Sequence, residues 1–135
     1  MKHTINGQIA GLSATVLGEN RIDLYVTGAR SVMLFVTGEQ ISAFAVPVRS
    51  MVAVTIAAPE HETEQTTPPA VVIRGQIIVV GLDDMRHPFI DFLPDRLRDD
   101  EPPSKPVRFS VDLSAVQEFG ASIGFPATIT VAPIG

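Results

Sequence analysis

Two aspartates at matching places in the chain are the first candidates for chemistry. Asp23 lies in the triplet Ile-Asp-Leu and Asp91 in the triplet Ile-Asp-Phe, and each stands sixteen residues after the glycine of a repeated Ile-x-Gly-Gln-Ile motif. Two carboxylates that are brought together can share one proton, which makes a general acid–base device. The Asp-Thr/Ser-Gly turn of aspartic proteases is absent, however, and alternation along a strand predicts instead that both side chains face solvent.

A second group of candidates lies in one short segment. Asp83, Asp84, Arg86 and His87 combine two carboxylates, a guanidinium and an imidazole. Oxygen ligands with an imidazole suit Mn²⁺, Mg²⁺ or Zn²⁺. We predict no metal ligands elsewhere in the chain, which lacks the Asp-x-Asp/Asn-x-Asp/Asn-Gly pattern of a calcium-binding loop. We therefore expect a solvated hairpin turn, with a ligand- or partner-binding loop as its functional alternative, and we predict no metal site and no cofactor.

A charged, proline-rich loop at 94–106 contains the remaining binding candidates, Arg96 and Arg98. Local ion pairs explain such a mixed run of charges, but exposed loops of this kind also dock partners. No serine lies in a Gly-x-Ser-x-Gly elbow, and no glycine pattern before a helix is suited to hold a phosphate. Catalysis is therefore not predicted, although an acid–base role for the two aspartates stays open.

Composition narrows the classes of function. The chain of 135 residues has no cysteine, which excludes disulfides, thiolate zinc sites and cysteine nucleophiles. Its formal net charge is −5 and neither half is basic, so nucleic-acid binding is disfavoured. No apolar run approaches the roughly 18 residues of a membrane span, and the N-terminus lacks the apolar core of a signal peptide. We therefore expect a cytoplasmic protein without membrane contact.

Apolar alternation and turn residues predict strands and two short helices. Hydrophobic content is 45% and aromatic content only 6%, so the core must rest on β-branched residues, which favour strands. Thr37, with Gln40 three residues later, fits a capping box for a two-turn helix, and Asp112 is a good N-cap for a helix over Leu113–Gly120. The residues that these helices are expected to bury are Ile41, Phe44, Ala45, Val116 and Phe119. The expected strands are His3–Ala14, Arg21–Thr27, 32–36, Met51–Ala57, Val71–Leu82, Phe89–Leu93, Val107–Val111 and Ala127–Val131.

The order of these elements occurs twice along the chain. The opening motif Ile5–Ile9 returns as Ile73–Ile77, a shift of 68, and the apolar positions from Val32 to Ile56 align without a gap at a shift of 75. The longer loop at 94–106 accounts for the difference. We predict an internally duplicated unit of strand, strand, strand, short helix and strand, with repeat 1 at about 1–58, a linker at 59–69 and repeat 2 at about 70–135.

The predicted fold is one mainly β (α+β) domain in which the two repeats pack as a pseudo-twofold β-barrel or β-sandwich. One eight-stranded mixed sheet is the alternative. The apolar run at 77–80 predicts a strand that is covered on both faces.

The function predicted from the sequence is that of a non-enzymatic interaction or assembly module. It would contact an unknown protein partner, or a second copy in a homodimer, through the loops 58–69 and 94–106. A small enzyme or ligand-binding protein with a carboxylate-lined site between the repeats is the alternative, and a nucleic-acid-binding barrel is a disfavoured third.

Overall fold

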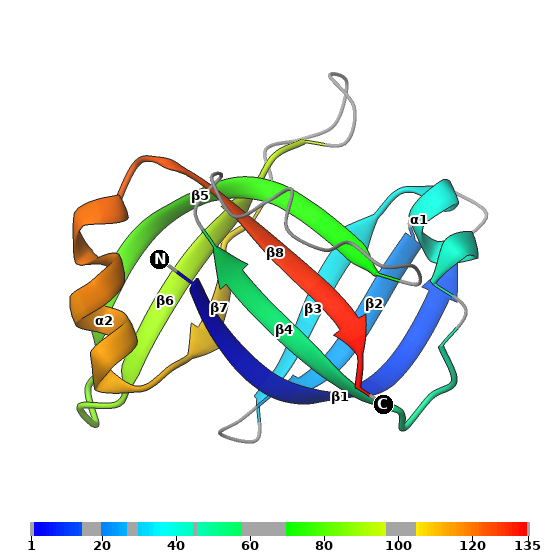
Figure 1. Ribbon diagram of the computed structural model, residues 1–135, viewed down its shortest axis with the longest axis horizontal. Coiled ribbons are helices and arrows are strands. Elements are labelled where there is room, and N and C mark those ends of the chain that lie inside the picture. The colour runs from blue at the N-terminus through cyan, green and yellow to red at the C-terminus, as the bar shows by residue number, and fades with distance from the viewer. Residues whose placement is uncertain are drawn as a thin grey trace.

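The strands of the computed structural model form one sheet that curls into a nearly closed barrel (Figure 1). The structure describes residues 2–14, 20–26, 30–44, 46–57, 70–96 and 105–134. The elements are β1 (Lys2–Ala14), β2 (Asn20–Val26), β3 (Arg30–Val36), α1 (Gly38–Ala43), β4 (Met51–Ala57), β5 (Val71–Leu82), β6 (Pro88–Pro94), β7 (Val107–Ser110), α2 (Leu113–Phe119), the 3₁₀ turn η2 (Gly120–Ser122) and β8 (Pro126–Pro133). The strand order is β3-β2-β1-β4-β8-β5-β6-β7, and the terminal strands β3 and β7 approach each other. Helices α1 and α2 lie at opposite ends of the barrel (Figure 1).

All the pairings between these strands are antiparallel. The prediction of a mainly β barrel is confirmed, and the alternative of a mixed sheet is wrong. No pair of hydrogen-bonded strands runs in the same direction. The strand register therefore determines which outward side chains of neighbouring strands lie next to each other.

Alternation along the strands sends one row of side chains into the barrel. On β2, Ile22, Leu24 and Val26 are buried, while Tyr25 between them is exposed. The same alternation buries Val32, Leu34 and Val36 of β3, as the sequence predicts. One continuous apolar cluster fills the interior, and its largest fully buried side chains are Phe44, Phe92, Phe109 and Phe119.

Both helices begin at the residues that the sequence predicts. The Thr37 hydroxyl accepts from the Gln40 N–H, and the Gln40 side chain accepts from the Thr37 N–H, which completes the capping box. The predicted buried stripes are only partly correct. Phe44 and Phe119 are buried, but Ile41 and Val116 are half-buried, and Ala115 is fully buried in place of Val116. Ala45 lies outside the described residues.

The two halves of the described chain share one pattern of strand pairing. Gly7 pairs with Val26, and Gly75 pairs with Pro94, which are the same positions under the shift of 68. A β-bulge follows at the same place in each half, between Ile9 and Gly11 in β1 and between Ile77 and Val79 in β5. The order of the strands also reads the same from both ends when β1–β4 are exchanged for β5–β8. The midpoint of this arrangement is the pair Thr55 and Thr130 between β4 and β8.

The loops that enter β4 and β8 match in backbone conformation too. Arg49 and Gly124 have φ angles of 76° and 86°, and the N–H of each donates to a β1 or β5 carbonyl, Ile9 or Ile77, at 2.8 Å. A non-glycine residue in this left-handed region is strained by about 1–2 kcal/mol. The surrounding contacts must therefore maintain the left-handed conformation at Arg49.

The prediction that residues 77–80 are covered on both faces is wrong. Ile77 is fully buried, but Val79 is 41% exposed. Strand β8 pairs with β5 only as far as Gln76, and beyond that point β5 pairs with β6 alone. The bulge after Ile77 also interrupts the alternation of side chains. A continuous apolar sequence therefore forms a strand with one solvent-facing side.

Candidate functional site

A polar groove collects more hydrogen-bonding and titratable side chains than the other described hollow. It has a volume of about 570 Å³ and lies between the start of β1, the turn from β5 to β6 and the segment that joins β7 to α2. Its lining residues are His3, Thr4, Ile5, Asn6, Asp83, His87, Pro88, Ser110, Val111 and Asp112. We call it the β1 edge groove. A second hollow, of about 440 Å³, lies beside the same turn, and Asp83 lines both.

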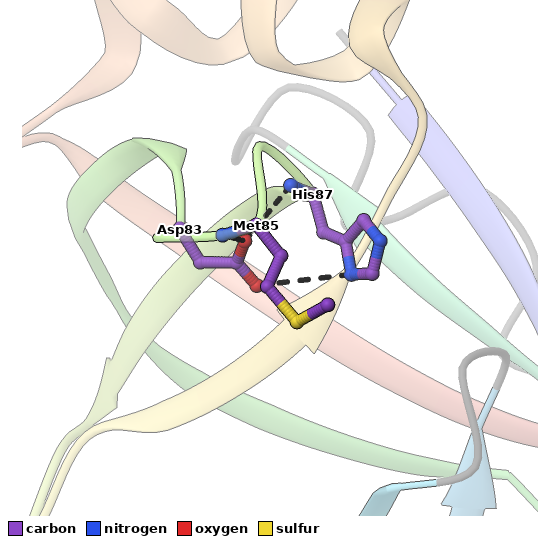
Figure 2. Close-up of polar contacts among 3 residues, drawn as sticks. All are labelled: Asp83, Met85 and His87. Carbon is purple, nitrogen blue, oxygen red and sulfur yellow. Dashed lines mark hydrogen bonds and ion pairs between the residues drawn. The ribbon is translucent and has the colours of Figure 1, made fainter.

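The β5–β6 turn is shaped by the carboxylate of Asp83 (Figure 2). Its Oδ1 accepts from the N–H of Met85 at 2.9 Å and from the N–H of His87 at 2.8 Å, and its Oδ2 lies 3.9 Å from His87 Nδ1. Arg86 takes a φ angle of 61°, which the turn requires. The predicted hairpin turn is therefore present, and the carboxylate of Asp83 stabilises it.

Asp112 forms the opposite wall of the groove. Its carboxylate accepts from the Ser114 hydroxyl at 2.7 Å and from the Ala115 N–H at 3.0 Å, as an N-cap does. These two hydrogen bonds, with a smaller contribution from the charge of His3, hold the pKa of Asp112 below its ordinary value of 3.8. The carboxylate is therefore ionised at neutral pH.

Replacing Asp112 with alanine is expected to destabilise the protein at pH 7 and to have little effect near pH 2. Because the pKa of Asp112 is lowered in the folded state, its contribution is present above the unfolded pKa and is lost as the pH falls through the folded value. Urea unfolding followed by circular dichroism at both pH values measures the difference from the wild type. Glu118→Ala, at an exposed position on the same helix, is the control. A difference that stays constant with pH would contradict the capping role.

Asp91 lies on the outer side of β6 in an ion pair with Arg108 of β7. Arg108 Nε and Nη2 donate to the two carboxylate oxygens at 2.8 and 3.0 Å, and the guanidinium lies 3.8 Å from the centre of the Phe89 ring. The hydrogen bonds to Asp91 raise the pKa of Arg108 above its ordinary value, and the charge of Asp83 adds to this. Asp91 is only 9% exposed, so the expectation that it faces open solvent is wrong.

Asp23 occupies the matching place on β2 and pairs with a different arginine. Its Oδ1 lies 2.9 Å from Nε of Arg21, two residues earlier on the same strand. Arg21 Nη2 donates to Oδ2 at 3.3 Å. Asp23 and Asp91 lie on β2 and β6, three or more strand spacings of about 4.8 Å apart. The structure therefore does not bring them together, and they cannot share a proton in this arrangement.

The other predicted site residues are scattered. Asp84, Arg86 and Arg96 are exposed, and Arg98 lies outside the described residues. Among the residues that the structure describes, no group of three or more histidines and acids is placed to hold a metal ion. Within the same residues, no helix is long and apolar enough to cross a membrane.

Sequence reasoning missed the β1 wall and the Asp112 wall of the groove. His3 and Thr4 lie about eighty residues before the turn on the other side of the groove, and no local spacing predicts that they line the same groove. Asp112 was visible only as a helix cap. The alignment of the two halves could have predicted this groove. It indicates which loop of one half lies beside the first strand of the other half.

Comparisons with known proteins give little further information. No protein-family model matches the chain, and no curated protein matches it either. Among solved structures it is similar to the cytoplasmic molybdate-binding protein ModG in a molybdate-bound form, at 12% identity. The match covers 96% of this chain and 89% of that chain with a TM-score of 0.36. A score this low carries no conclusion about the ligand or the function.

Proposed function

We propose that the protein is a non-enzymatic assembly module that associates with a second copy of itself through the outer face of β2 and β3. The observation that carries this proposal is a row of exposed apolar side chains. Tyr25, Met33 and Phe35 are 54%, 50% and 49% exposed, although the chain has only eight aromatic residues. Large side chains of this kind form the centres of protein interfaces.

The charge of this face supports a second copy as the partner. Arg21 and Asp23 lie beside the apolar row and neutralise each other. Two molecules with a net charge of −5 can therefore meet at this face without like charges in contact. A twofold contact needs only that the same surface is complementary to itself.

The strand at the margin of this face supports the same proposal. β3 ends the sheet, and within the described chain its outer edge is approached by β7 but pairs with no strand. From Ser31 to Val36 it carries no charge, proline or bulge, which are the features that usually protect an edge from pairing. At the positions in β7 that match Met33 and Phe35, the chain has Arg108 and Ser110. The apolar face is thus confined to one half of the barrel.

We also propose that the two halves arose by internal duplication. The equivalent registers, the two matched bulges and the matched left-handed residues Arg49 and Gly124 support this origin. A duplicated unit that later diverged would keep its backbone and change its outer surface. That is the pattern seen at the Met33 and Arg108 positions.

The alternative of an enzyme with a carboxylate-lined site gains no support from the geometry. Asp23 and Asp91 are separated and paired with arginines, and Asp83 is held by the turn. The loop 58–69 and the part 97–104 of the second charged loop lie outside the described residues. Contacts through these loops stay a prediction from the sequence.

Sedimentation velocity over a range of protein concentrations tests the proposed self-association. The wild type is expected to form dimers as the concentration rises into the micromolar range, and Phe35→Lys is expected to remain monomeric. Met85→Lys is the control, because Met85 is 76% exposed on the β5–β6 turn, away from the face. A wild type that is monomeric at all concentrations, or dimers that persist equally in Phe35→Lys, would overturn the proposal.

A further inference from the structure

One contact that closes the first half of the barrel is missing from the second. In the first half, α1 reaches across to the start of β5, where Gln40 Nε2 donates to the Val72 carbonyl at 2.9 Å. The matching residues in the other half are Ala115 of α2 and Thr4 of β1, under the same shifts of 75 and 68. Alanine has no polar side chain, so the carbonyl of Thr4 receives no such hydrogen bond. The β1 edge groove lies at this place.

The backbone of Thr4 points into the groove. Successive residues of a strand direct their N–H and C=O groups to alternate sides. The N–H of Ile9 donates to Ser50 on the β4 side, so Thr4, five residues earlier and before the bulge, faces the opposite side. Among the described residues, the pairing with β2 runs from Gly7 to Ala14. Thr4 is exposed and lines the groove on this side of β1, and no strand within the described residues pairs with it there.

The matching half confirms this direction independently. Val72 is five residues before Ile77, which is the counterpart of Ile9, and its carbonyl also faces away from β8 and meets the Gln40 amide. In the first half, the side-chain amide N–H of Gln40 thus lies beside this strand edge. The equivalent position beside Thr4 is the open space of the groove.

The charges of the groove select the kind of ligand. Asp83 and Asp112 stand in its walls, and the other titratable residues in the lining are His3 and His87. Within the part of the chain that the structure describes, no lysine or arginine lines the groove. The carboxylates of Asp83 and Asp112 favour a basic side chain in the ligand.

We propose that the β1 edge groove binds an extended peptide segment of a partner protein that contains a basic residue. The peptide backbone pairs with the N–H and C=O of Thr4 and forms a short added strand beside the start of β1. Its lysine or arginine side chain faces Asp83 and Asp112. This site is separate from the β2–β3 face, so it does not depend on the proposed self-association.

Two acetylated and amidated hexapeptides test the site, Thr-Val-Lys-Val-Thr-Val and the same peptide with Glu in place of Lys. Titration into ¹⁵N-labelled full-length protein is expected to give saturable shifts of the amide signals of Thr4 and Asp112 with the lysine peptide. The glutamate peptide is expected to bind at least tenfold more weakly. Equal affinity of the two peptides, or no saturable shift with either up to millimolar concentration, would overturn the proposal.

Two variants separate the backbone contact from the charge. Thr4→Pro removes the N–H on the open edge, where proline is tolerated, and it is expected to weaken the lysine peptide about tenfold. Thr4→Ala keeps the N–H and is expected to bind like the wild type. Asp112→Asn keeps a good helix cap but removes the charge, and a loss of about threefold is expected. Unchanged binding in Thr4→Pro would contradict strand addition, and unchanged binding in Asp112→Asn would contradict the charge selection. Because peptide binding is measured separately from sedimentation, either proposal can fail without the other.

Discussion

Replacing Gly75 with alanine is expected to destabilise the barrel by about 3 kcal/mol or more. A Cβ atom at this position would overlap the Leu93 carbonyl oxygen, and it would lie 2.7 Å from Phe92 Cζ and 2.9 Å from Pro94 Cα. Two of these three neighbours are backbone atoms of β6, which pairs directly with Gly75. They can give way only if β6 moves, and β6 carries Ile90 and Phe92 into the core. Denaturant unfolding followed by circular dichroism measures the loss.

Gly7 provides the matched control for this prediction. It occupies the same position in the repeated motif, but a Cβ there would lie 3.0 Å from the Tyr25 carbonyl oxygen and no closer than 3.6 Å to the other neighbours. A shift of a few tenths of an ångström relieves this contact, so Gly7→Ala is expected to cost about 1 kcal/mol. Equal losses in the two variants would show that the closer packing of β5 on β6 has no consequence for stability.

The elements of the fold could be predicted from the sequence because their signals are local. Thr37 and Gln40 are three residues apart and satisfy each other, and Asp112 precedes its helix directly. Alternation of Ile22, Leu24 and Val26 decides which side of β2 is buried. The order of the elements in each half could be read in the same way, because each turn stands next to the strands that it joins.

The pairing across the barrel and the contacts on its outer side could not be predicted in this way. The partner of Asp91 is seventeen residues away on another strand, and its place depends on the register that the bulge after Ile77 sets. The partner of Asp23 is two residues away on the same strand, so alternation alone places it within reach. The arginine partner of Asp23 could thus be predicted from the sequence, whereas the arginine partner of Asp91 depends on the tertiary fold. The β1 edge groove also depends on the tertiary fold.

Replacing Arg108 with alanine is expected to cost about 3 kcal/mol, because it leaves the carboxylate of Asp91 buried without its partner. The side chain of Asp91 is 12% exposed, and it accepts two hydrogen bonds from Arg108. The change also removes the guanidinium that covers the Phe89 ring. Thermal and denaturant unfolding measure the loss.

Two further variants distinguish a buried unpaired charge from a simple loss of packing. Removing both partners in Asp91→Ala/Arg108→Ala is expected to recover part of the lost stability, since no unpaired charge then remains. Arg21→Ala is the matched control in the other half. The side chain of Asp23 is 25% exposed, so water can replace its arginine, and a cost of about 1 kcal/mol or less is expected. A double variant that is less stable than Arg108→Ala alone would show that packing against Phe89, and not the pairing of Asp91, stabilises this side of the barrel.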